Sequence, residues 1–208
     1  MHKYHYSRQC LICHKDKETG SSLYHFIYKS PICIDCLNKF EIANYHGHLN
    51  GYKLTILYQY NDYFKKLLFN YKGLYDLALK DAFVSQFDFS KYKKHLVVIA
   101  PSNEEDNIKR GFNPNLMIVR TFSKKIFTGI YKTSFYKQTS SKNRKDVKDY
   151  LAIKKGEDLR GKRLLIFDDV TTSLSTLRAI ISLCEKFSPK SIEILVLASH
   201  QLDQISKI

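Results

Sequence analysis

The chain has 208 residues, of which 44% are hydrophobic and 26% are charged. This balance excludes a disordered chain and suits one main globular domain with a small accessory module. The longest apolar stretches, such as Ile192–Ala198, fall far short of the roughly 20 residues that a membrane helix needs. No charged-then-apolar leader opens the chain, so we expect a cytoplasmic protein without membrane insertion.

The formal net charge is +14, from 34 basic and 20 acidic side chains. Such an excess favours polyanionic partners, which include nucleic acids, nucleotides and polyphosphates. A lysine-rich proteome would produce the same excess without any such partner, because lysine far outnumbers arginine in this chain. The composition therefore leaves both interpretations open.

Four of the five cysteines form two Cys-x-x-Cys units with nineteen residues between them. In a cytosolic chain such units indicate metal ligands before disulfides. Thiolates suit Zn²⁺ or an iron–sulfur cluster, and the spacing is typical of structural zinc sites. We therefore predict a zinc-binding module over residues 1–45, in which His14 or His25 could replace one cysteine. The predicted ligands are Cys10, Cys13, Cys33 and Cys36.

Strand and helix patterns alternate after this module. Lys53–Tyr60 alternates in polarity and is rich in β-formers, which predicts a strand. Apolar residues at helical spacing predict a helix over Tyr63–Tyr71, ended by Gly73, and a second helix over Leu74–Phe87.

A short β-branched run over His95–Ala100 predicts a buried parallel strand. Its carboxyl end leads into a polar loop, Ser102–Phe112. Asn113 and Pro114 then suit the N-cap and first position of a helix, which we expect to run to about Phe127.

The segment Ile130–Lys155 is polar and basic with weak periodicity, which indicates either a mobile loop or a solvated linker. After it, Leu164–Phe167 and Ile192–Ala198 are predicted as buried strands, and the helix between them has one apolar face that contains Cys184. Strand, helix and strand in this order form right-handed parallel crossovers. We therefore predict that residues 46–208 fold as an α/β domain with an open, mainly parallel sheet flanked by helices.

The loop that follows Phe167 carries the chemistry. Asp168 and Asp169 come at the carboxyl end of a strand, where ligands bind in open α/β sheets, and such acids bind ribose hydroxyls or a Mg²⁺ ion. Four hydroxyls follow at the amino end of the next helix, which favours an anion. An ordinary capped turn needs only one hydroxyl, so we predict a pocket for a ribose 5-phosphate. The hydroxyl side chains are Thr172, Ser173, Ser175 and Thr176.

Phe167–Leu177 resembles the phosphoribosyl pyrophosphate signature of type I phosphoribosyltransferases, in which Asp-Asp-Val follows an apolar strand and precedes Thr-Thr-Gly-x-Thr. The whole chain resembles the ComF family of competence-associated proteins more closely. The paired cysteines correspond to that family's zinc finger, and the segment from Arg110 to Asn113 matches its Arg-Gly-Phe-Asn motif. Further matching positions are the strand with Tyr58 and Tyr60, the lysine-bearing helix from Lys65 to Lys72, the loop Ala100-Pro101-Ser102, Gln138 and Arg144.

The resemblance implies a role for several of these positions. Asp168 and Asp169 would contact ribose hydroxyls or Mg²⁺, and the hydroxyls of Thr172–Thr176 would hold the 5-phosphate. The loop that holds Pro101 and Ser102 would correspond to the pyrophosphate loop.

By the same resemblance, Arg110 and Arg144 would bind anions or belong to a lid, since a planar guanidinium donates two parallel hydrogen bonds to phosphate. The chain departs from the family at Ser173, in place of threonine, and at Val147, in place of asparagine. It also has Leu174 in place of the glycine that lets backbone approach a phosphate. We expect Leu174 to narrow or reshape the pocket, which weakens catalytic turnover more than the fold.

Two functions follow from these features. In one, the protein is a phosphoribosyltransferase that uses phosphoribosyl pyrophosphate with Mg²⁺ and moves the ribosyl group to an acceptor. In the other, which we prefer, the fold serves as a ligand-sensing or nucleic-acid-handling module. The ComF resemblance implies a role in natural transformation, with single-stranded DNA and a helicase as partners. The positive charge, 15 tyrosines and 13 phenylalanines suit strand binding, although core packing accounts for most of these rings.

Overall fold

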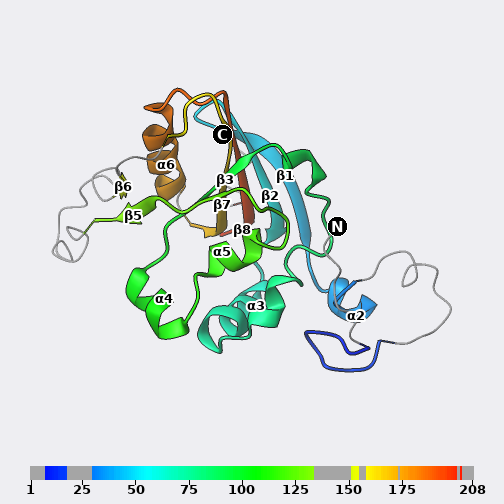
Figure 1. Cartoon of the computed structure of the whole chain (residues 1–208). Helices are drawn as coiled ribbons and strands as arrows, with labels where there is room; N and C mark the ends of the chain where they lie inside the picture. The colour runs from blue at the N-terminus through cyan, green and yellow to red at the C-terminus, as the bar shows by residue number, and fades with distance from the viewer. Residues whose placement is uncertain are drawn as a thin grey trace.

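The computed structural model describes six stretches of the chain, and Figure 1 shows how their helices and strands are arranged. The described residues are 8–17, 30–133, 151–154, 158–172, 174–200 and 202.

A six-stranded sheet forms the centre of the molecule, in the spatial order β1-β2-β8-β7-β3-β4 (Figure 1). β1 pairs with β2 antiparallel, and the other four pairings are parallel. The open, mainly parallel sheet that the sequence predicts is therefore confirmed. The strands are β1 (Ile42–Leu49), β2 (Tyr52–Gln59), β3 (Leu96–Ile99), β4 (Ile126–Phe127), β7 (Arg163–Thr171) and β8 (Ser191–Ser199).

Helices cover both faces of this sheet. Residues of α3 and α5 share one hydrophobic core with one face, and residues of α6 share a second core with the other face. The sheet is thus the middle layer of three. The helices are α2 (Ile34–Leu37), α3 (Asp62–Gly73), α4 (Glu104–Arg110), α5 (Pro114–Val119) and α6 (Ser175–Glu185).

Alternate residues of β7 supply both cores. Leu165 and Phe167 pack in the core with α3 and α5, whereas Leu164 and Ile166 pack in the core with α6. Because both faces are covered, these four consecutive residues are all buried, which explains the continuous apolar run in the sequence. Cys184 of α6 is also fully buried, as its place on the apolar face predicts.

The predicted cap of α5 is confirmed, but the predicted end of that helix is wrong. The Asn113 side chain accepts a hydrogen bond from the Leu116 backbone N–H at 3.0 Å, and Pro114 occupies the first turn. The helix ends at Val119 instead of near Phe127. The Thr121 hydroxyl donates to the Ile118 carbonyl at 2.6 Å, which offers that carbonyl a partner outside the helical ladder. The chain then enters β4, whose pairing with β3 outweighs the helical pattern.

Two other predicted elements differ from the structure. Leu74–Phe87 forms turns and a short 3₁₀ helix, Leu77–Lys80, in place of an α-helix. Tyr75 adopts a left-handed backbone conformation with φ 62°, which breaks helical continuity directly after α3. The predicted loop Ser102–Phe112 contains α4, which begins after an Asn103 cap and ends at Gly111 with φ 77°.

A small antiparallel hairpin lies outside the main sheet, beside α6 (Figure 1). Its strands are β5 (Ile130–Lys132) and β6 (Leu151–Ile153), so the two ends of the basic segment Ile130–Lys155 pair with each other. Residues 134–150 between them lie outside the described residues. None of the helices in the described part of the chain has the length and apolar character that crossing a bilayer requires.

Candidate functional site

The direction in which successive strands are added to the sheet reverses between β3 and β7. From β7 the chain crosses through α6 to β8 on one side, and from β3 it crosses through α5 to β4 on the other. Such a switch point leaves a crevice at the carboxyl ends of the two strands, where ligands bind in open α/β sheets. β3 ends at Ile99, opposite Phe167, so Asp168 and the rest of β7 extend beyond the end of β3.

Asp168 and Asp169 lie next to each other at this switch point, and each carboxylate has a different partner. Asp169 is buried and forms an ion pair with Lys72 of α3. Asp168 accepts a hydrogen bond from the Asn115 side-chain amide at 3.1 Å and another from the Asp169 backbone N–H at 3.0 Å. The same Asn115 amide donates to the Ala100 carbonyl at 3.3 Å, which joins the ends of β3 and β7.

The surroundings of Asp168 disfavour its charge. Burial first, and repulsion by the Asp169 carboxylate second, raise the pKa of Asp168 to about 7, although the Asn115 hydrogen bond and Lys72 act in the opposite direction. The two adjacent carboxylates have one ammonium, that of Lys72, which pairs with Asp169. The site, which is partly closed, therefore has an excess of acidic groups. A hard cation or the hydroxyls of a sugar would supply the missing positive charge or donors.

The acid pair suits Mg²⁺ by the chemistry of its donors. Mg²⁺ binds carboxylate oxygens and keeps several waters and ligand phosphates in its coordination shell. Asp168 offers such an oxygen. Asn115 adds an amide oxygen, buried and without a hydrogen-bond partner among the described residues. The residues present therefore fit a divalent cation, which Asp168 and the Asn115 amide oxygen would help to hold.

The loop between β7 and α6 makes a tight turn directly before the helix. Thr172 is exposed, and Leu174 adopts a left-handed conformation with φ 57° immediately before α6 begins at Ser175. The Thr171 hydroxyl accepts a hydrogen bond from the Leu174 backbone N–H at 3.3 Å, which fixes the turn. Thr176 lies in the first turn of α6, whose aligned peptide dipoles favour an anion. Ser173 lies outside the described residues.

Leu174 occupies the signature's glycine position in the conformation that glycine favours. A left-handed conformation costs a residue with a Cβ atom about 1–2 kcal/mol. The Leu174 side chain is only 7% exposed and packs in the core on the α6 side of the sheet. The side chain therefore fills the interior beneath the loop, and the turn itself keeps the shape that the glycine allows.

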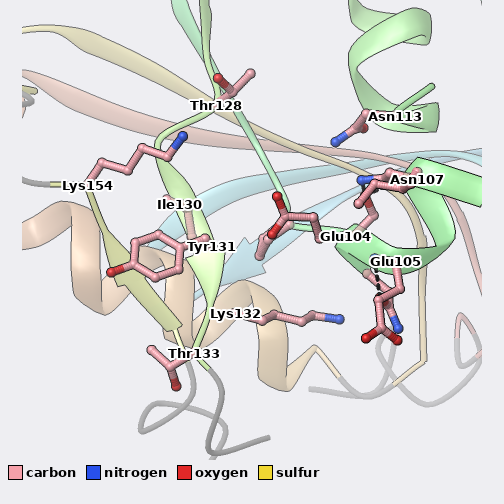
Figure 2. Close-up of a pocket in the computed structure, with 14 residues that line it drawn as sticks. Glu104, Glu105, Asn107, Asn113, Thr128, Ile130, Tyr131, Lys132, Thr133 and Lys154 are labelled. Carbon is pink, nitrogen blue, oxygen red and sulfur yellow. Dashed lines mark hydrogen bonds between the residues drawn. The ribbon is translucent and has the colours of Figure 1, made fainter. Parts of the chain in front are cut away.

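The loop after β3 borders a cavity of about 930 Å³ between α4 and the β5–β6 hairpin. Pro101 and Ser102 line it on one side, and Figure 2 shows Lys132 reaching into it from β5. Ser102 and Asn107 hydrogen bond to each other at 2.7 Å, which joins this loop to α4. The residues that line the cavity begin at Pro101, one residue beyond Ala100, and include neither Asp168 nor Asp169 nor a described residue of the β7–α6 loop.

Arg110 has a structural role in addition to the anion-binding role that the resemblance implies. Its Nε donates to the Lys72 carbonyl at 2.8 Å, and one terminal nitrogen lies 3.4 Å from the Asn107 side-chain oxygen. These contacts attach α4 to the end of α3 that carries the Asp169 partner. Gln138 and Arg144 lie outside the described residues.

Sequence reasoning assigned no role to four residues at this edge of the sheet. Lys72 is the last lysine of the helix that resembles the ComF family, without an assigned role, and Asn115 follows the Asn113 cap without a signal of its own. Tyr60 and His200 follow β2 and β8, and their rings lie 3.7 Å apart between centroids. The family resemblance includes Tyr60 and the helix that carries Lys72 but gives them no partner, because these contacts form only through tertiary packing.

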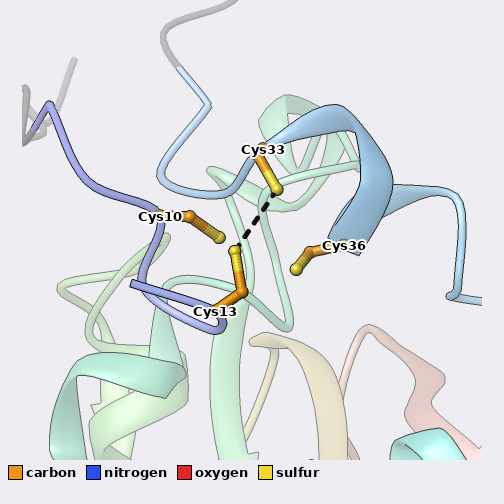
Figure 3. Close-up of side chains that lie close together, drawn as sticks. All are labelled: Cys10, Cys13, Cys33 and Cys36. Atoms are coloured by element: carbon orange, nitrogen blue, oxygen red, sulfur yellow. Dashed lines mark hydrogen bonds between the residues drawn. The ribbon is translucent and has the colours of Figure 1, made fainter. Parts of the chain in front are cut away.

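The four cysteines of the two Cys-x-x-Cys units converge on one point (Figure 3). Their sulfur atoms all lie within 4.8 Å of one another, and the sulfurs of Cys13 and Cys33 are 3.7 Å apart. Zn–S bonds of about 2.3 Å in a tetrahedron place sulfurs roughly 3.8 Å apart, so the cluster has the size of a zinc site. Burial acts to raise the pKa of Cys10, but backbone hydrogen bonds at Cys13, Cys33 and Ile12 lower it to about 6. The four cysteines therefore lie close enough to bind a zinc ion.

This cysteine cluster packs directly against the α/β domain. Cys36 and Phe40 belong to the core that contains α3 and α5. The Tyr63 hydroxyl of α3 donates to the Cys36 carbonyl at 3.0 Å, and the Phe40 ring lies 5.0 Å from the Tyr58 ring of β2. The cysteine cluster thus shares buried surface with the helix that carries Lys72.

Comparison with known proteins agrees with this architecture. The model of the phosphoribosyl transferase domain family matches residues 108–207, which include β7, its acid pair and the following loop. This chain has a phosphoribosyltransferase-like fold. No curated protein sequence matches the chain.

Solved phosphoribosyltransferase structures also resemble the chain, at low identity. The purine phosphoribosyltransferase from Pyrococcus horikoshii Ot3 is 24% identical, with 58% of this chain and 69% of that chain covered and a TM-score of 0.38. A hypoxanthine phosphoribosyltransferase from Staphylococcus aureus is also 24% identical, with 52% and 55% covered and a TM-score of 0.32. The adenine phosphoribosyltransferase from Saccharomyces cerevisiae is 16% identical, with 71% and 76% covered and a TM-score of 0.34.

Proposed function

We propose that the β7–α6 loop binds the 5-phosphate of a phosphoribosyl ligand, and that Asp168 and Asp169 bind its ribose hydroxyls or a Mg²⁺ ion. The observation that carries this proposal is the continuous run from a buried strand through an acid pair and a left-handed turn into a helix. Each part supplies one need of the ligand, since sugar hydroxyls need acceptors and a phosphate needs amides and hydroxyls.

In this proposal the chain's own residues position the ligand. Thr172, Ser173, Ser175 and Thr176 hold the phosphate, Pro101 and Ser102 border the pyrophosphate, and Arg110 and Arg144 add cations. When bound, Mg²⁺ neutralises the negative charge that gathers between pyrophosphate and the acid pair. Lys72 holds Asp169 in place through the ion pair, and Asn115 orients Asp168. Transfer of the ribosyl group to an acceptor would then rest on positioning and charge stabilisation.

Calorimetry with phosphoribosyl pyrophosphate and Mg²⁺ tests this proposal. We expect binding at micromolar or poorer affinity, on the order of −8 kcal/mol or weaker, and at least a tenfold loss in Asp168→Asn/Asp169→Asn. Asp158→Asn is the matched control, because Asp158 is exposed beyond the opposite end of β7. Equal affinity in wild type and the double variant would refute the site. Release of pyrophosphate on adding a nucleobase would establish the transferase over the binding module.

A more specific identity rests on the order of the motifs. We propose that the protein is a ComF-like competence protein that handles incoming single-stranded DNA with a helicase partner. The cysteine pairs, the Arg110–Asn113 motif and the Asp168-Asp169 loop occur in that family's order, and the net charge of +14 favours a polyanion. In this role zinc stabilises the cysteine module. DNA binding that weakens steeply with salt supports this role, and absence of binding at about 50 mM salt rejects it.

A further inference from the structure

The excess positive charge gathers at the edge of the sheet opposite the acid pair. We define the amino edge as the residues within three positions of the first residue of each parallel strand, β2, β3, β4, β7 and β8. These windows hold nine lysines and arginines and one carboxylate, Glu193. The cations are Lys53, Lys93, Lys94, Lys124, Lys125, Arg160, Lys162, Arg163 and Lys190.

The pairing of the strands places these cations side by side. The Val97 backbone N–H donates to the Lys125 carbonyl at 2.9 Å, which joins the starts of β3 and β4. Leu96 of β3 pairs with Leu164 of β7. The Lys190 backbone N–H donates to the Lys162 carbonyl at 2.8 Å, which joins the starts of β7 and β8. Neighbouring strands lie about 4.8 Å apart, so the five strand starts form a line roughly 19 Å long.

The cations on this line are available to a partner. All nine are exposed, and none of them forms an ion pair with a carboxylate within the part of the chain that the structure describes. Glu193, the single acid, lies 3.3 Å from His95. Three carboxylates from outside the windows also lie near the line: Asp88 interacts with Lys93, Asp158 accepts from the Arg160 backbone N–H and Glu185 accepts from the Tyr52 hydroxyl. The nine cations still outnumber these acids, and like charges in excess repel one another and reduce stability. Their concentration on one edge indicates an external polyanion that the edge accommodates.

The same edge lacks the features of a membrane or base-stacking surface. The exposed large hydrophobic residues of the described chain lie elsewhere, for example Phe69, Leu74, Ile108 and Tyr131. Tyr92 and His95, the rings nearest β3, are 3% and 4% exposed. Tyr52, at the start of β2, is half-buried, and its hydroxyl donates to Glu185. A bilayer surface needs apolar groups to insert, and base recognition needs exposed rings. A line of cations alone fits a linear chain of phosphates.

We propose that the amino edge binds the phosphate backbone of a nucleic acid, without reading its bases. This inference rests on the nucleic-acid part of the proposed function and gives it a location. The edge lies at the opposite ends of the strands from Asp168 and Asp169, so a nucleic acid and a phosphoribosyl ligand occupy separate sites. Both can bind at once, and the protein can hold a strand while its loop is occupied.

The experiment is fluorescence polarisation of a labelled thymidine 20-mer against the full-length protein at several salt concentrations. Lys93→Glu/Lys94→Glu/Lys125→Glu removes three edge cations, and Lys65→Glu/Lys66→Glu/Lys109→Glu makes the same charge change on exposed residues of α3 and α4. We expect at least a tenfold loss for the edge variant and less than threefold for the control. For single strands, each phosphate contact adds about 0.7 to the slope of log affinity against log salt concentration. The slope for the edge variant should therefore be smaller by about 2.

Each outcome decides one claim. Equal losses in the two variants would show that net charge alone drives binding, and would refute the edge while DNA binding stands. No binding by wild type at low salt would reject both the edge and the nucleic-acid role, but leave the phosphoribosyl site unaffected. The same variants are tested for binding to vesicles that contain phosphatidylserine. If the edge variant loses vesicle binding but keeps its affinity for the 20-mer, the nucleic-acid assignment is wrong. If the glutamate variant unfolds, it is replaced by Lys93→Gln/Lys94→Gln/Lys125→Gln. We expect the salt slope of this variant to fall by the same amount.

Discussion

Lys72, in the last turn of α3, forms an ion pair with Asp169 at the carboxyl end of β7. Asp169 is buried, and the neighbouring Asp168 adds a second carboxylate. The ion pair therefore joins a helix on one face of the sheet to the two adjacent acids that we propose bind the ligand. The Lys72 carbonyl also accepts from Arg110, so the same residue attaches α4.

Removal of the Lys72 ammonium should destabilise the protein. Lys72→Met would leave Asp169 buried without a counter-charge, which costs about 3–5 kcal/mol for a fully buried pair. Because the Lys72 side chain is 30% exposed, we expect a smaller loss, about 1–3 kcal/mol in the free energy of unfolding by urea. Asp169→Asn in the same chain should restore part of the loss, and Lys65→Met should change little. Additive effects of Lys72→Met and Asp169→Asn would mean that the pair does not couple.

The raised pKa of Asp168 predicts a pH dependence of stability. The folded protein holds this proton up to a pKa of about 7, whereas the unfolded chain releases it near 3.8. Between these values the folded state binds more protons, so Asp168 lowers the free energy of unfolding as the pH rises from about 4 to 7. Asp168→Asn should therefore melt at a higher temperature than wild type at pH 8, with a smaller difference at pH 4.5. A difference that stays constant with pH would contradict this, and Asp158→Asn controls for loss of an exposed carboxylate.

The sequence predicts the strands and the acid pair because their signals are local. Leu164–Phe167 is apolar on both faces, and two acids at the end of such a run have few structural explanations. Lys72 and Asn115 carry no such signal, since each meets Asp168 or Asp169 only after α3 and α5 have packed on the sheet. β1 was not predicted, because Ile42–Leu49 contains His, Asn and Gly and is buried only at its last residue.

Local competition explains the other differences. The signals for α4 were present, with Asn103 as cap, three acids in the first turn and Gly111 at the end, but the polar composition favoured a loop. Leu74–Phe87 has helical spacing, yet Tyr75 breaks the backbone and the apolar residues reach the core from turns. The Leu174 side chain enters the core on the α6 side, which the sequence alone does not show, so its effect on the pocket could not be predicted.

Leu174→Gly and Leu174→Ala should separate backbone strain from side-chain burial. Both remove a buried side chain, which costs about 2–5 kcal/mol for leucine to alanine. Glycine also relieves the left-handed strain of about 1–2 kcal/mol, whereas alanine retains it. We therefore expect Leu174→Gly to be more stable than Leu174→Ala in urea unfolding, the reverse of the usual order in a helix or strand. If alanine is the more stable variant, position 174 does not adopt the left-handed conformation in solution.

Removal of zinc should affect the cysteine module and the helix against which it packs. We expect a strong chelator to increase amide hydrogen exchange over residues 8–17 and 30–40, and in the first turn of α3, because Tyr63 donates to the Cys36 carbonyl. The strands β7 and β8 lie between two cores, of which the one with α6 contains no residue of 8–17 or 30–40, so their protection should persist. Zinc added back should restore protection, and Cys10→Ser/Cys13→Ser should reproduce the chelated state without chelator. If chelation exposes β7 and β8 together with the module, the cysteine segment and the α/β domain unfold as one cooperative unit, and the division near residue 45 is wrong.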